Sequence, residues 1–120
     1  MQELSLDQQL ENINVSEAQA KEMIEIREAL MRLNNNADFK KIILEQYFKK
    51  EPERICILTG RLSHDDKAVT RLHNDLKAIG ALQQFFTTIH QGANAALKTL
   101  EDTEQERLRI EEEAQQQQQQ

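Results

Sequence analysis

Apolar residues recur at alternating intervals of three and four through most of the second half of the chain. Between residues 69 and 100 this repeat passes through ten positions, of which only Gln83 and His90 are strongly polar. Such spacing keeps side chains on one face of an α-helix. No proline interrupts residues 64–114. The pattern therefore predicts one long helix over 64–113, capped by Ser63.

A second repeat of the same kind lies near the N-terminus and predicts a helix over residues 16–34. Ser16 and Gln19 have the spacing of a reciprocal helix cap, and three asparagines at 34–36 favour its end. We expect this helix to pack antiparallel along the first half of the long helix. Together the two repeats predict one interaction seam, which consists of Met23, Ile26, Leu30, Leu33, Val69, Leu72, Leu76, Ile79, Phe86, His90, Leu97 and Leu100.

Two short helices are predicted between these repeats. Asp38 can cap a helix over 38–50, and Pro52 disfavours a helical conformation at Glu51 while suiting the first position of a helix over 52–60 that ends at Gly60. These two helices form a small head. Residues 1–15 show no consistent apolar face and are expected to be a weakly ordered arm, and the glutamine-rich residues 114–120 a disordered tail. Residues 16–113 are expected to form a single helical domain.

Composition supports an all-α fold. The chain has 120 residues, of which 38% are apolar, with three glycines and one proline. So few turn-forming residues disfavour a sheet of several strands. A helix of about 50 residues is about 75 Å long, whereas a compact chain of this size has a radius of gyration of about 14 Å. We therefore expect an elongated helical hairpin with one long C-terminal helix, whose seam is covered by other copies or by a partner.

The charge of the chain is unevenly distributed. The net charge is −6, made up of −4 in residues 1–36, +3 in residues 37–100 and −5 in residues 101–120. Acidic ends argue against a dedicated nucleic-acid-binding protein, because such proteins rely on neutralising phosphates. No apolar stretch is long enough to span a membrane, and the N-terminus does not resemble a signal peptide. We expect a soluble protein.

No constellation of residues predicts catalysis, a metal, a cofactor or a small-molecule substrate. His64 and His73 are nine residues apart, which is out of phase for shared metal ligation on one helix. Cys56 lacks a neighbouring base and is predicted to be a small core residue. His90 and Gln83 are predicted to be buried or half-buried polar residues that set the register between helices. We therefore expect a protein that is not an enzyme.

Basic residues alternate with aromatic ones in the head. This basic head consists of Lys40, Lys41, Lys49, Lys50 and Arg54, next to Phe39, Tyr47 and Phe48. Charge plus stacking could bind single-stranded nucleic acid, and charge alone could bind an acidic partner. However, residues nine apart on an α-helix point to nearly opposite sides. This favours a simpler interpretation, in which the aromatic residues pack inward and the lysines extend into solvent.

The segment NNADFKKIILEQYFKKEPERICIL, residues 35–58, resembles a motif in small helical proteins of tailed bacteriophages. The residues that carry the match are Asp38, Phe39, Lys40, Lys41, Ile43, Leu44, Tyr47, Phe48, Lys49 and Arg54. The resemblance implies a structural protein of the virion, present in the host cytoplasm during assembly, whose partners are further copies or other phage structural proteins. One alternative is a transient scaffold or chaperone for capsid, portal or tail assembly. Another is a small nucleic-acid-binding regulator that uses the basic head.

Overall fold

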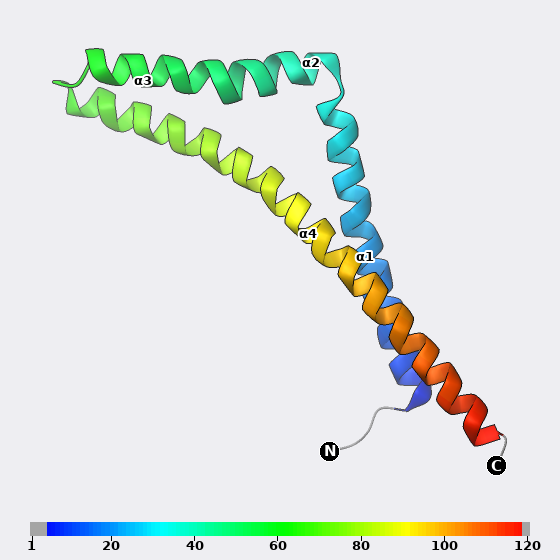
Figure 1. The fold of residues 1–120 in the computed structure, drawn as a ribbon. Coiled ribbons are helices and arrows are strands. Elements are labelled where there is room, and N and C mark those ends of the chain that lie inside the picture. The colour runs from blue at the N-terminus through cyan, green and yellow to red at the C-terminus, as the bar shows by residue number, and fades with distance from the viewer. Residues whose placement is uncertain (1–4, 119–120) are drawn as a thin grey trace. The chain divides into compact units, whose positions relative to one another are not determined.

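The computed structural model describes residues 5–118, which form helices and contain no strand (Figure 1). An all-α fold with one long C-terminal helix is thereby confirmed. Residues 1–4 of the predicted arm and 119–120 of the predicted tail lie outside the described residues. The elements are α1 (Leu6–Asn34), α2 (Ala37–Phe39), the π-helix η1 (Lys40–Lys50), α3 (Glu51–Arg61) and α4 (Asp66–Gln118).

Helix α1 begins earlier than predicted. The Ser5 hydroxyl oxygen accepts a hydrogen bond from the Gln8 backbone N–H at 3.2 Å, and the Ser5 N–H donates to Gln8 Oε1 at 3.1 Å. This reciprocal cap satisfies two groups at the helix start, so the predicted start at Ser16 is wrong. Residues 6–15, expected to be weakly ordered, are helical, and Ile13 among them is buried. The helix ends at Asn34, as predicted.

The chain divides into two compact units, where the sequence suggested a single domain over 16–113. Residues 1–27 and 89–120 make up the terminal unit, and residues 28–88 make up the central unit. Residues 6–27 of α1 therefore pair with the second half of α4, and the prediction that this helix packs along the first half is wrong for most of its length. The physical reason is that residues 37–61 form one long helical segment that covers the first half of α4 instead.

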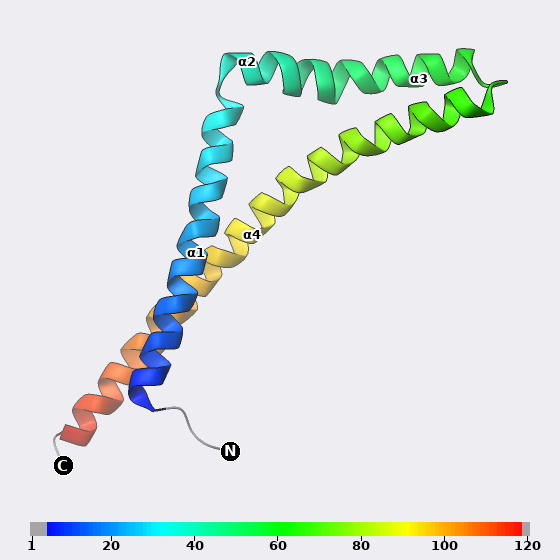
Figure 2. The same cartoon turned by 180° about the vertical axis from the view of Figure 1, so that it is seen from behind.

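In the terminal unit, α1 and α4 run antiparallel and side by side, as both views show (Figures 1 and 2). The interface is built largely from small residues, which let two helix backbones approach each other closely. The predicted seam position Leu97 is exposed, whereas its neighbour Ala96 is buried. The buried apolar residues of this unit are Ile13, Ala20, Ala93, Ala96 and Ile110.

In the central unit, α2, η1 and α3 follow one another without a break and pack on the first part of α4. The core consists of Ile55, Leu72 and Ile79, with Tyr47, Phe48, Leu58 and Leu62 packed against it. Leu30 and Ala68 are also buried in this unit. Cys56 is exposed, so its assignment to the core is wrong. Its neighbour Ile55 occupies the buried face of α3, and the next residue along a helix points about 100° away.

Two other helix starts differ from the predicted ones. The Asn36 side-chain oxygen accepts from the Phe39 N–H at 3.0 Å, in the role predicted for Asp38. Asp65 Oδ1 accepts from the Ala68 N–H at 3.1 Å, in the role predicted for Ser63. In both cases the observed cap lies two residues from the predicted one. Serine, asparagine and aspartate cap helices about equally well, so the local sequence does not show which of the two residues is the cap.

The helix ends also differ. Helix α3 continues past Gly60 to Arg61, and α4 extends to Gln118, so residues 114–118 are helical rather than disordered.

Pro52 does not interrupt the helical segment. It lies in the first turn of α3, as predicted, where its fixed φ is compatible with a helix. Glu51, however, keeps helical dihedral angles of φ −62° and ψ −48°, and its N–H donates to the Gln46 carbonyl five residues back. The wider π-helical turn before the proline accounts for this continuity, because it changes the spacing between the proline ring and the preceding carbonyls.

Candidate interaction surfaces

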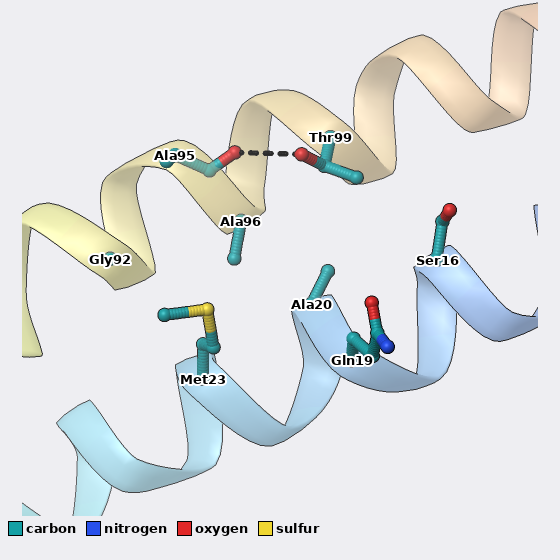
Figure 3. Close-up of a pocket in the computed structure, with 8 residues that line it drawn as sticks. All are labelled: Ser16, Gln19, Ala20, Met23, Gly92, Ala95, Ala96 and Thr99. Carbon is teal, nitrogen blue, oxygen red and sulfur yellow. Dashed lines mark hydrogen bonds between the residues drawn. The ribbon is translucent and has the colours of Figure 1, made fainter.

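A shallow apolar groove runs between the two helices of the terminal unit (Figure 3). Its volume is about 210 Å³. Ala20 and Ala96 each point toward the opposite helix, and the Met23 thioether lies over Gly92. The residues that line it are Ser16, Gln19, Ala20 and Met23 from α1, and Gly92, Ala95, Ala96 and Thr99 from α4. We call these eight residues the groove face.

Polar contacts hold α1 and α4 of the terminal unit in register. Arg27 donates to the Asn94 side-chain oxygen at 2.8 Å. Further along, Arg107 donates to the Asn14 side-chain oxygen at 2.7 Å and forms an ion pair with Glu17 at 3.1 Å. The Glu17 side chain is 19% exposed and that of Arg107 34% exposed, so this pair lies partly inside the helix interface. Charged groups at such positions select one alignment of two helices, because other alignments leave them unpaired.

Phe86 is the centre of an aromatic cluster in the central unit. Its ring lies 6.2 Å from that of Phe39 and 5.8 Å from that of Phe48, measured between centroids, and the second pair is edge-to-face. Tyr47 extends the cluster through Phe48 at 6.0 Å. The aromatic residues of the basic head are therefore engaged with α4. Phe85, the neighbour of Phe86, is 59% exposed.

The π-helical geometry of η1 changes the arrangement expected for the basic head. A π-helix has roughly 4.4 residues per turn, because its hydrogen bonds span five residues instead of four. Residues nine apart are then about two full turns apart and lie on the same side. Lys40 therefore aligns with Lys49, and Lys41 with Lys50. The prediction that these pairs point to opposite sides is wrong for this helix.

The same geometry explains the apolar spacing of this segment. Phe39, Ile43, Leu44, Tyr47 and Phe48 are half-buried and recur at intervals of about four to five, which an α-helix would spread around its axis. The π-helix collects them on the side that packs against α4. The four lysines lie on the other side and are exposed. We call Lys40, Lys41, Lys49 and Lys50 the lysine face.

Arg54, the fifth residue of the basic head, has a different environment. It forms a bidentate pair with Glu51, with both hydrogen bonds at 2.8 Å. These hydrogen bonds from Arg54 lower the pKa of the Glu51 carboxyl below its ordinary value. The same hydrogen bonds to the Glu51 carboxylate raise the pKa of Arg54. Its charge is thus matched locally, whereas no ion pair within residues 5–118 involves a lysine of the lysine face.

The structure separates the predicted interaction seam into three groups. Leu30, Leu72 and Ile79 are buried. Val69, Phe86, His90 and Leu100 are half-buried, whereas Gln83, predicted to be at least half-buried, is exposed. The remaining seam residues have exposed fractions between 42% and 48%, and these are Met23, Ile26, Leu33, Leu76 and Leu97.

Some packing residues escaped the sequence analysis. On α4 the inner face of the terminal unit follows residues 89, 93, 96, 100, 103, 107, 110 and 114, which are buried or half-buried. This repeat of four and three continues well beyond the predicted limit at Leu100. The signal is visible if alanine and threonine are counted as packing residues. The predicted seam contains Leu97, whereas its smaller neighbour Ala96 occupies the inner face in the structure.

Within residues 5–118, no group of three histidine, cysteine or acidic side chains is arranged to hold a metal ion. None of the helices in this range combines the length and apolar character needed to cross a bilayer. Comparison with protein families, characterised proteins and solved structures finds no match to this chain.

Proposed function

We propose that this chain is an assembly protein, without a catalytic step, whose copies cover one another's apolar helix faces in a tailed-phage particle. The groove face of the terminal unit is the surface at which a second copy docks. The phage setting rests on the resemblance of residues 35–58 to small helical phage proteins. The docking role rests on the large apolar side chains that are exposed around the groove face.

The observation that carries the proposal is the number of large apolar side chains left open around the groove. Met23 is 44% exposed, Ile26 47% and Val15 51%. They lie at positions 15, 23 and 26, which share one side of α1 next to the groove. Large exposed apolar side chains beside an apolar groove offer a surface that a partner helix can cover. Burying it stabilises an assembly by about 25 cal/mol per Å², before the costs of ordering are subtracted.

A second copy is the favoured occupant because the terminal unit has few large buried residues of its own. Two helices that meet largely through alanines bury little apolar area, and small helical units commonly gain stability by adding helices from other chains. A helix of the same composition presents matching small and apolar residues to the groove. An antiparallel pair of helices can thus become part of a larger bundle.

Blocking the groove tests this proposal. Ala95 lines the groove and is exposed, so Ala95→Arg places a long charged side chain in it with little effect on the helix. Ala18 is also exposed, lies on α1 and does not line the groove, so Ala18→Arg is the matched control. We expect A95R to shift the sedimentation of the protein toward the monomer and A18R to leave it unchanged. Equal behaviour of the two variants would contradict the proposal.

The phage setting is tested separately by mass spectrometry of purified mature particles. A structural component is expected at a fixed ratio to the major particle proteins. Presence in immature particles but absence from mature ones would instead assign the chain to the transient scaffolds or chaperones. Absence from both kinds of particle would overturn the phage setting. The proposal of self-assembly would then be tested only by the A95R and A18R variants.

A further inference from the structure

The lysine face is a positively charged surface that the fold leaves uncovered. Its four lysines and Glu45, the acidic residue among them on η1, are all exposed. The apolar side of the same helix is occupied, because Phe39 and Phe48 pack on Phe86. Charge is therefore the property that this face offers to a partner.

A complementary surface exists on the C-terminal part of α4. Thr103, Arg107 and Ile110 belong to the inner face of the terminal unit and mark the side of α4 that meets α1. By helical spacing Glu101 and Glu112 lie on the side of α4 away from them, and Glu104 and Glu111 lie on the adjoining flank. All four are exposed. We call Glu101, Glu104, Glu111 and Glu112 the acidic stripe.

Glu106 and Glu113, two other acidic residues of this segment, already have cationic partners. Arg109 forms ion pairs with Glu106 and with Glu113, the latter at 2.8 Å. Arg107 is engaged with Glu17 across the helix interface. None of the ion pairs within residues 5–118 includes a residue of the acidic stripe. The stripe thus carries four carboxylates whose charge is not matched locally.

We infer that the lysine face of one copy docks on the acidic stripe of a second copy. This inference rests on the proposed function, and adds to it a second, electrostatic contact between copies. The two surfaces differ from each other, so the contact is head-to-tail. Contacts of this type repeat from copy to copy and produce a ring if the rotation closes or a filament if it does not.

Charge complementarity favours a second copy over nucleic acid. Four lysines meet four carboxylates of the same chain, so every copy brings both halves of the contact. Single-stranded nucleic acid is bound by charge together with stacking on aromatic rings, and the rings of this segment already pack on Phe86. The net charge of −6 also opposes a polyanion at long range.

Charge reversal tests the inference with the full-length chain. A face-reversed variant has the substitutions K40E, K41E, K49E and K50E. A stripe-reversed variant has E101K, E104K, E111K and E112K. The matched control reverses the other four lysines of the chain, which are all exposed, and has K21E, K67E, K77E and K98E. It carries the same net charge as the face-reversed variant. Circular dichroism checks that each variant is helical.

Sedimentation velocity at about 50 mM salt is the readout, because charge contacts between exposed groups are strongest at low ionic strength. We expect self-association of the face-reversed and stripe-reversed variants to be roughly tenfold weaker than that of the matched control. An equimolar mixture of the two reversed variants should regain association, because each supplies the charge that the other lacks. Salt of about 500 mM should weaken the wild type toward the level of the reversed variants.

Three results would overturn the inference. Association of the face-reversed variant that equals that of the matched control removes the lysine face from the contact. A mixture that stays as weak as its components shows that the two surfaces do not meet between copies. Binding of a single-stranded oligonucleotide that is lost only in the face-reversed variant, with self-association unchanged, assigns the face to nucleic acid. In each of these cases, docking through the apolar groove face can persist at high salt. A wild type that is monomeric at both salt concentrations would contradict the proposed function as well.

Discussion

Met23 occupies the space that a side chain at residue 92 would need. A Cβ on Gly92 would lie 2.5 Å from the terminal Cε of Met23 and 3.9 Å from its sulfur. A side chain at residue 92 would therefore displace the flexible end of Met23 from its place between α1 and α4. Gly80, on the same helix in the central unit, has no atom within 4 Å of the corresponding point apart from its chain neighbours and the nearby backbone of its own helix, and provides a comparison.

Alanine substitutions at these glycines should have different effects on stability. Alanine stabilises a helix interior by about 1 kcal/mol relative to glycine, and we expect G80A to gain about this amount. G92A should gain less, because the methionine must rotate away from the groove. In the background of Met23→Ala, the gain from G92A should recover. Denaturant unfolding at fixed protein concentration measures this cycle, and equal gains at both glycines in the wild-type background would contradict the packing described.

Phe86 and Phe85 are adjacent in sequence but should respond differently to truncation. Phe86 contacts Phe39 and Phe48, so we expect Phe86→Ala to lower the free energy of unfolding by about 2–4 kcal/mol. Phe85 is largely exposed, and Phe85→Ala should cost less than about 1 kcal/mol. Chemical denaturation of the two variants gives both values. Similar losses would mean that the aromatic cluster is not a centre of packing.

Arg107 and Arg109 offer a second matched pair. Arg107 links α4 to Asn14 and Glu17 of α1 and is partly buried, so Arg107→Ala should destabilise the protein by about 1–2 kcal/mol. Arg109 pairs only with residues of its own helix and is more exposed, so Arg109→Ala should cost about 0.5 kcal/mol or less. Thermal unfolding compares the two. A larger loss of stability for R109A than for R107A would mean that the contacts of Arg107 do not fix the alignment of α1 and α4.

The pair Glu51–Arg54 predicts a dependence on acid. The folded-state pKa of Glu51 is lowered from 4.5 by the hydrogen bonds from Arg54, so the pair stabilises the fold above pH 4.5. This contribution is lost as the pH falls through the lowered pKa. Titration of the Glu51 carboxyl by nuclear magnetic resonance measures the effect. In Arg54→Met the pKa should return toward 4.5, and an unchanged pKa would exclude Arg54 as its cause.

The general fold could be predicted from the sequence because its signals are strong and local. The proline-free repeat after Ser63 predicts one long helix, and Asn34 to Asn36 predict the end of α1. The choice of partner helix could not be predicted in this way. Leu97 seemed a better packing residue than Ala96, because apolar area favours leucine. A close helix pair instead selects the smaller side chain, and only the position of the other helix reveals which criterion applies.

The lysine face was missed for a geometric reason. Helical spacing was judged by the α-helical repeat, in which Lys40 and Lys49 diverge. The intervals from Phe39 to Ile43 or Leu44 and on to Phe48 already matched the wider π-helical repeat, so the signal was present in the apolar residues. π-helices of any length are rare, and the pattern therefore carries little weight before the backbone is known.

Sedimentation equilibrium of the wild-type chain over a range of concentrations tests the central claim, that other copies cover its open apolar faces, most directly. One chain has a mass of 14.0 kDa. The account predicts an average mass that rises with concentration to a multiple of this value, and that A95R lowers it. A mass of one chain at every concentration, in a fully helical protein, would contradict the account.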